Sequence, residues 1–205
     1  MSNFKRSDFF NCKPIPNILK KTRMYSAGIL PYQIGENEKI YFLVGKDQQG
    51  TWSDFGGKCE IQDFNNIKET ASREFFEESL NAVIDLNTTR EMLKNEKNYN
   101  LIVSTTISGN PYYMFILRVP MLPDTCRDRF KKTLQYLQHI KAEYNCLEKT
   151  DIKWVSMDTI IHCLDNPEYE EILGWPLRKV FRTTMINNQK KLEEIKNQVF
   201  NLNII

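Results

Sequence analysis

One predicted helix carries acidic side chains on the same side as its apolar ones. The helix runs from Asn66 to about Leu80, and an α-helix turns by about 100° per residue. On that wheel Glu78 falls within the apolar stripe, and Glu74 and Glu77 spread along one flank of it. If the helix packs against the core with its apolar stripe, carboxylates are buried as well. Each ionised carboxylate removed from water costs several kcal/mol unless an opposite charge compensates. The stripe itself consists of Phe64, Ile67, Ala71 and Phe75.

A divalent cation is the compensation that best suits three carboxylates. Mg²⁺ and Mn²⁺ prefer hard oxygen ligands, and Mg²⁺ is commonly held by a few carboxylates together with substrate phosphates. Such an ion can activate water and neutralise charge on phosphoanhydride oxygens. The alternative is a solvated helix surface, because Glu69 and Glu77 each lie four residues from Arg73 and can pair with it. For glutamates on a helix with no other signal, the solvated surface is the commoner outcome.

The segment before the helix favours the metal site over that alternative. Gly56 and Gly57 predict a sharp turn that brings a backbone carbonyl oxygen close to a metal ion. Lys58 and Glu60 place charge at the mouth of the same loop. A pair of glycines alone indicates only a turn, and its combination with the three glutamates predicts a metal centre.

Residues 57–80, GKCEIQDFNNIKETASREFFEESL, resemble the Nudix box, in which a glycine and a glutamate precede R-E-apolar-x-E-E-x-G. The resemblance rests on the REFFEE core and the GGK-x-E before it, and it extends over about residues 24–165. It implies a Nudix-type α/β/α sandwich around a mixed β-sheet, here with an added C-terminal helix. It also implies hydrolysis of a phosphoanhydride bond in a nucleoside diphosphate linked to another group, with Mg²⁺ or Mn²⁺ as cofactor.

The same resemblance implies roles for the residues that match the box. Arg73 would orient the catalytic helix, and Glu74 would serve as a metal ligand or as the base. Glu77 and Glu78 would bind metal, and Gly56 would offer its carbonyl oxygen as a further ligand.

A further acid is expected from a later loop, because the family tends to supply one there. Glu148, which stands just before a predicted strand, is the preferred candidate for a catalytic role. Glu143 and Asp151 are the alternatives, and a plain surface role is about as common for any one of the three.

Two departures from the box concern the ends of the catalytic helix. The span from Gly57 to Arg73 is two residues longer than usual, so Asp63 or Asn65 would take the place of the family's early glutamate. Leu80 stands where the family has a glycine that ends the helix in a left-handed turn, so the helix is expected to run on or to end differently. Neither departure touches the metal-binding acids.

The rest of the chain alternates between predicted strands and helices. A basic, irregular arm is expected over residues 1–23 and one Nudix domain over residues 24–205. Connections after Tyr32 and Ile107 are too short for parallel crossovers, so the sheet is expected to be mixed or antiparallel. The predicted strands are 24–34, 39–47, 51–60, 98–107, 112–120 and the first part of 151–160. The other predicted helices are 88–96 with a threonine cap, 124–147, the second part of 151–160, and 175–200.

The composition is typical of a cytoplasmic globular protein. The 205 residues include 28 basic and 26 acidic ones, and the formal net charge of +2 does not by itself indicate a nucleic-acid binder. No signal peptide and no apolar run of membrane-spanning length is seen. The five cysteines contain no CxxC pair, which predicts reduced thiols rather than a zinc site. These are Cys12, Cys59, Cys126, Cys146 and Cys163.

The box does not choose the substrate. A small nucleotide-type compound is favoured, and capped or otherwise 5′-modified RNA is the alternative, because basic residues gather in the arm and in the last helix. A non-catalytic Nudix binding module is a third alternative, but such a module has no physical need for three crowded acids. Lys58 is a candidate for substrate binding. Candidates for stacking on a base, although such aromatic residues are more often core, are Tyr32, Trp52, Phe55, Tyr112 and Tyr113.

Overall fold

The structure is a computed structural model. It describes residues 24–36, 38–120, 125–142, 147–166, 168 and 176–202. Several predictions fall outside these residues, namely those on the basic arm (1–23), Cys12, Glu143, Cys146 and the start of the last helix at Trp175. Within the described residues, no helix is long and apolar enough to cross a membrane.

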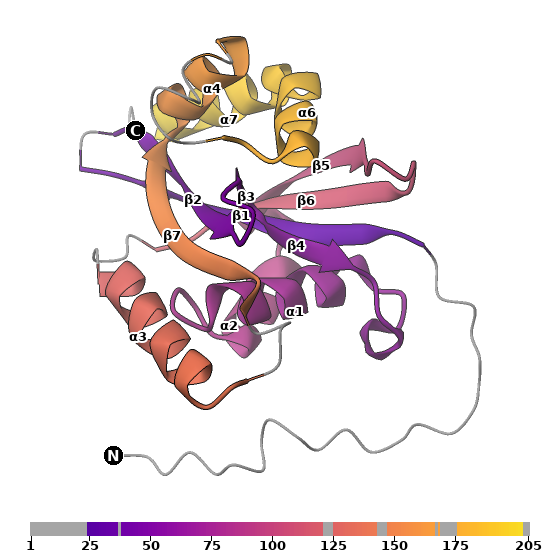
Figure 1. The fold of residues 1–205 in the computed structure, drawn as a ribbon. Coiled ribbons are helices and arrows are strands. Elements are labelled where there is room, and N and C mark those ends of the chain that lie inside the picture. Colours follow the sequence, from indigo (N-terminus) through magenta and orange to yellow (C-terminus); the bar gives the residue numbers. More distant parts are fainter. Residues whose placement is uncertain are drawn as a thin grey trace.

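Seven strands of the described residues form one mixed sheet (Figure 1). The order β3-β2-β1-β6-β5 places β1 at the centre, and β4 pairs with β1 while β7 pairs with β2. Strand β1 runs parallel to β6, whereas the β1–β2 and β5–β6 pairs are antiparallel hairpins. The prediction from the short connections is thus confirmed. The strands are β1 (Ser26–Ile34), β2 (Ile40–Asp47), β3 (Trp52–Ser53), β4 (Phe55–Lys58), β5 (Tyr99–Thr105), β6 (Pro111–Arg118) and β7 (Lys149–Ser156).

Helices cover both faces of this sheet. Side chains alternate along β1, so Ala27 and Ile29 pack into one apolar core while Leu30 and Tyr32 pack into another. Figure 1 shows α1, α2 and α3 on one side of the sheet and α4, α6 and α7 on the other. The expected α/β/α sandwich is therefore confirmed. The helices are α1 (Ile67–Ser79), α2 (Leu86–Lys94), α3 (Thr125–His139), α4 (Met157–Asp165), α6 (Lys179–Asn187) and α7 (Gln189–Leu202).

Helix α1 occupies nearly the predicted range, and its C-terminus ends in a left-handed turn. The side chain of Asn66 caps its N-terminus by accepting a hydrogen bond of 3.0 Å from the backbone N–H of Lys68. At the other end Leu80 has a left-handed φ of 52°, and its N–H donates to the carbonyl oxygen of Glu77. Leu80 thus adopts the conformation that a glycine usually supplies there. The expectation that the helix runs on or ends differently is wrong.

Four local predictions differ from the structure. Phe64 precedes α1, has a φ of 53° and is 78% exposed, so it is not part of the apolar stripe. The cap of α2 is Asp85 rather than a threonine. Helix α3 ends at His139, earlier than predicted. The single predicted C-terminal helix is two helices, α6 and α7, because the α-helical conformation breaks at Asn188.

Candidate active site

The two glycines upstream of α1 lie in a strand, not in a sharp turn. Gly56 and Gly57 belong to β4, and neither has a positive φ. A Cβ atom at Gly56 would stand 2.7 Å from the Cα of Gly28 on β1, and one at Gly57 would overlap the carboxylate of Glu74. The glycines therefore allow β4 to approach both β1 and the acidic helix closely, which corrects the predicted turn.

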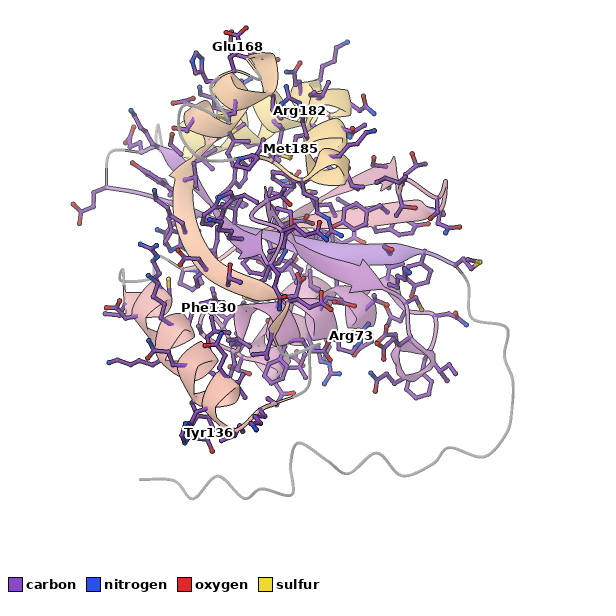
Figure 2. The ribbon with its side chains drawn as sticks, viewed as in Figure 1. Arg73, Phe130, Tyr136, Glu168, Arg182 and Met185 are labelled. Atoms are coloured by element: carbon purple, nitrogen blue, oxygen red, sulfur yellow. The ribbon has the colours of Figure 1, made fainter. Side chains whose placement is uncertain are left out.

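Arg73 is the centre of a buried charge network on the α1 side of the sheet (Figure 2). Its Nε donates to Asp63 Oδ1 at 2.9 Å, and its Nη2 donates to Asp63 Oδ2 at 3.0 Å. Nη1 lies 3.0 Å from a carboxylate oxygen of Glu74 and 3.0 Å from one of Glu77. Nη2 also donates to the backbone carbonyl of Lys58 at 2.9 Å. The guanidinium thus ties α1 to β4 and to the loop between them.

Asp63, one of the two loop residues considered for the place of the early glutamate, is buried and contacts Arg73. Asp63 is 2% exposed, and its Oδ2 also accepts hydrogen bonds from the Thr70 hydroxyl at 2.9 Å and from the Glu60 backbone N–H at 2.8 Å. Burial would raise the pKa of Asp63, but the hydrogen bonds, with that from Arg73 the largest, outweigh burial and hold the pKa below its usual value. Asn65 is not among the buried residues.

Glu74 and Glu77 both contact Arg73, yet this one positive charge does not keep their pKa values at the usual level. Burial raises the pKa of Glu74 to about 8 against the opposing charge of Arg73, and repulsion from Glu78 and Glu77 adds to the rise. Burial likewise raises the pKa of Glu77, again opposed by Arg73. One guanidinium therefore does not offset the removal of these carboxylates from water.

Glu78 is held by two partners that come from different strands. It is 4% exposed, and its Oε2 accepts a hydrogen bond of 2.7 Å from the backbone N–H of Gly56. Its Oε1 lies 3.5 Å from Nζ of Lys149, which begins β7 and is also buried. Burial raises the pKa of Glu78 to about 7, and the Lys149 charge opposes that rise. The place of Glu78 in the apolar stripe predicted its burial, whereas no sequence pattern pointed to Lys149.

A second buried polar contact that the sequence did not predict lies beside Lys149. The Tyr112 hydroxyl donates a hydrogen bond to the Asp54 carboxylate, and both side chains are buried. Burial raises the pKa of Asp54, opposed by the Tyr112 hydrogen bond and by Lys149, and burial raises the pKa of Tyr112 as well. The sequence shows an aspartate within the aromatic segment TWSDFGG, but it does not indicate Tyr112 as the partner, because Tyr112 is far away along the chain.

The candidates for the later acid are in different surroundings. Glu148 is exposed, and its negative charge lies close enough to contribute to the raised pKa of Glu78. Asp151 accepts a hydrogen bond of 2.9 Å from Nε of Arg127 on α3, so it is engaged in a separate ion pair. Asp151 is thus occupied by Arg127, whereas the charge of Glu148 acts on Glu78. Lys58 is exposed at the end of β4.

Four of the five aromatic residues considered for base stacking are core residues. Phe55 is fully buried, with its ring edge-to-face against Phe75 at 5.3 Å between centroids. The others lie in the core under α4, α6 and α7, so these rings present no exposed face to a base, which corrects that prediction. They are Tyr32, Trp52 and Tyr112.

The donor atoms of the acidic cluster fit a hard divalent cation. As the side chains lie, no three His, Cys, Asp or Glu residues within the described part of the chain are close enough together to hold a metal ion. Instead, Arg73 contacts Glu74 and Glu77, and Lys149 faces Glu78. Even so, the helix offers three carboxylates, two of them buried with raised pKa values, and such groups are stabilised by a nearby cation. Glu74, Glu77 and Glu78 are the residues that would hold it.

A cavity of about 350 Å³ lies elsewhere, between α1 and α2. Its walls include Asn66 and Ser72, and two of its cations are paired with acids: Arg90 Nη2 lies 2.8 Å from Glu69 and Lys94 Nζ lies 2.6 Å from Glu91. Because the cavity does not contain the buried carboxylates, the candidate site is identified by its chemistry and not by the size of a pocket.

Comparison with known proteins returns similar structures but no relative in sequence. No family model and no curated protein matches the chain. A Nudix hydrolase from M. smegmatis, RenU, is 14% identical, covers 85% of this chain and 90% of its own, and has a TM-score of 0.45. The C. elegans Ap4A hydrolase binary complex is 14% identical, with 72% and 92% coverage and a TM-score of 0.40. The NUDIX domain of Shewanella oneidensis NrtR, complexed with ADP ribose, is 9% identical, with 84% and 90% coverage and a TM-score of 0.44. Likeness at this level assigns neither an activity nor a substrate to the chain.

Proposed function

We propose that this chain is a Nudix hydrolase that uses Mg²⁺ or Mn²⁺ to cleave a phosphoanhydride bond in a nucleoside diphosphate linked to another group. The observation that carries the proposal is the set of three carboxylates of α1, Glu74, Glu77 and Glu78, gathered at a site where two of them are buried. Surface glutamates of a solvated helix would not lie in the core. The match of residues 57–80 to the Nudix box supports the same function.

The chain's own residues divide the work at this site. Glu77 and Glu78 bind metal, and Glu74 binds metal or accepts a proton from the attacking water, for which a pKa near neutrality is suitable. Arg73 holds Glu74 and Glu77 in place and anchors the loop through Asp63. When bound, the divalent ion activates water and neutralises charge on the anhydride oxygens. Glu148 stands beside the cluster as a further acid.

A small nucleotide-type compound is the proposed substrate. The RNA alternative depends on cations in the basic arm, which lies outside the described residues, and on cations along the last helices. Two of the described ones in these helices are engaged within the chain. Lys196 Nζ lies 2.9 Å from Asp158 on α4, and Lys191 Nζ lies 3.0 Å from Glu194. These pairs reduce the positive charge available to a phosphate backbone. The choice is tested with a panel of nucleotide sugars, dinucleoside polyphosphates, nucleoside triphosphates, diphosphoinositol phosphates and capped RNA.

The decisive variants change one acid at a time. Glu77→Gln and Glu78→Gln should each lower metal-dependent turnover by at least about a hundredfold, because they remove an anionic metal ligand with little change in shape. Glu69→Gln is the matched control, since Glu69 is on the same helix but pairs with Arg90, and it should retain turnover. Circular dichroism verifies that all three variants are folded. Undiminished turnover in both Glu77→Gln and Glu78→Gln would refute the metal site.

A further inference from the structure

Lys149 is a buried lysine whose ammonium group has several partners. Its side chain is 1% exposed, and Nζ donates to Ser53 Oγ at 2.9 Å and to the backbone carbonyl of Asp54 at 3.1 Å. Nζ also lies 5.9 Å from the centre of the Phe55 ring, within the range of a cation–π contact. Lysine is almost never fully buried unless it is paired, so this ammonium needs an anion.

Glu78 is that anion, at 3.5 Å from Nζ. The chain leaves room for the lysine stem, because a Cβ atom at Gly45 on β2 would stand 3.0 Å from Lys149 Cδ. The contact therefore joins β7 to α1 through a space that β2 keeps open.

The two cations of the site serve different acids. The Arg73 guanidinium contacts Glu74 and Glu77 on α1 and Asp63 in the loop. Among the described residues, the ion pairs of Arg73 do not include Glu78, for which Lys149 is the positive partner. Glu60 also lies 3.7 Å from Nη1 of Arg73, so five carboxylates face the two protein cations when all are ionised. Glu78 is the one that pairs with Lys149.

We propose that Lys149 is a positioning residue that acts as the resident counter-cation of Glu78 and competes with a divalent ion for that carboxylate. The inference rests on the proposed metal site and goes beyond it, because it assigns control of metal affinity to a residue outside the Nudix box. Nζ is fixed by Ser53 and Asp54, so it stays near Glu78 and repels a second cation there. Substrate phosphates would then supply ligands to a divalent ion that the protein alone held weakly. Lys149 thereby makes metal binding dependent on substrate.

The test is Mn²⁺ binding to the protein without substrate, measured by electron paramagnetic resonance. Lys149→Met keeps the unbranched stem of the side chain but removes its charged end, so it should bind Mn²⁺ at least about tenfold more tightly than wild type. Without metal it should melt at a lower temperature than wild type, because Glu78 is then buried without a cation. Mn²⁺ should raise its melting temperature more than that of wild type.

Two matched controls separate charge from packing. Lys149→Arg keeps the positive charge and should restore wild-type Mn²⁺ affinity. Ser53→Ala removes a partner of Nζ without changing any charge, so it should lower the melting temperature and leave Mn²⁺ affinity unchanged. A merely structural role for Lys149 predicts that Lys149→Met behaves like Ser53→Ala. Mn²⁺ affinity in Lys149→Met that equals or falls below wild type would overturn the proposal.

A double variant keeps the test decisive where Lys149→Met does not fold. Glu78→Gln combined with Lys149→Met removes both charges together and should fold and melt above Lys149→Met alone. A double variant that stays unfolded contradicts the pairing. The proposed function is judged separately: a wild-type protein that binds Mn²⁺ but hydrolyses nothing in the panel refutes the activity alone. A wild-type protein that binds no Mn²⁺ refutes both.

Discussion

The two faces of the sheet are packed in different ways. Under α4, α6 and α7 the core is mainly apolar, and the described side chains of these helices bury no charged residue. Its Tyr112 donates a hydrogen bond to the buried carboxylate of Asp54, which is the one buried acid in contact with this core among the described residues. Figure 2 shows Met185 on this side of the sheet and Arg73 on the other. On the α1 side the core includes five buried charged side chains next to Ala71 and Phe75. They are Asp63, Arg73, Glu74, Glu78 and Lys149.

The difference separates what stabilises the fold from what the fold can do. Apolar burial is favourable wherever water is excluded, so the core under α6 and α7 needs no further explanation than stability. Buried charges are costly unless each is compensated, and well-packed apolar residues in their place are often equally or more stable. The charges on the α1 side are therefore better explained by a ligand than by stability, and variants on the two faces should behave differently.

The largest effect should come from Arg73→Met. The substitution leaves Asp63, Glu74 and Glu77 without their shared cation, so it should lower the free energy of unfolding by about 3 to 5 kcal/mol and abolish turnover. Urea denaturation measures the first effect, and an assay of the remaining folded protein measures the second.

The matched variant on the other face is Leu192→Ala in α7, where Leu192 is fully buried. It should cost about 2 to 4 kcal/mol through the cavity it creates. Turnover per folded molecule should remain that of wild type, because no acid of the cluster loses a partner. Equal losses of turnover in the two variants would contradict the division between the faces.

The sequence predicted those features of the two faces that depend on neighbouring residues, and it missed contacts between residues that are far apart in the sequence. Helix α1 was predictable because its apolar spacing and its Asn66 cap are local. The same spacing misassigned Phe64, because the apolar period was extended into residues that precede the helix. Lys149 was not predictable, since its partners Ser53 and Glu78 are far away in the sequence and meet it only in the folded chain.

Corrections at the glycines and aromatics have a similar physical origin. Two adjacent glycines fit either a turn or a close approach of strands, and only the neighbours of Gly56 and Gly57 decide between them. Aromatic side chains near a site can stack on a ligand or fill the core, and Phe55 does the latter because Phe75 covers it. The break at Asn188 left no signal in the amphipathic pattern of the last helices.

A smaller effect on the free energy of unfolding should appear at low pH, and it should be specific to the charged face. The pKa of Asp63 is lower in the folded chain than its usual value, so folding favours the ionised form. The resulting stabilisation is present above the unfolded pKa of about 4 and is lost as pH falls through the folded pKa. Asp63→Asn should therefore be less stable than wild type at neutral pH, and the difference should shrink below about pH 4. Urea denaturation at a series of pH values measures it, and a difference that is constant with pH would contradict the assignment.

The smallest predicted effect concerns Phe64, in the loop between β4 and α1. Phe64 follows the buried Asp63 and is 78% exposed with a φ of 53°, a conformation that is costly for a bulky side chain. Asparagine adopts this conformation more readily, so Phe64→Asn should raise the free energy of unfolding by up to about 1 kcal/mol. Ile61→Asn is the control, because Ile61 is also exposed but has no positive φ, and it should bring no such gain. If Phe64→Asn instead lowers turnover at unchanged stability, the exposed ring contacts the substrate, and the strain at this position serves binding.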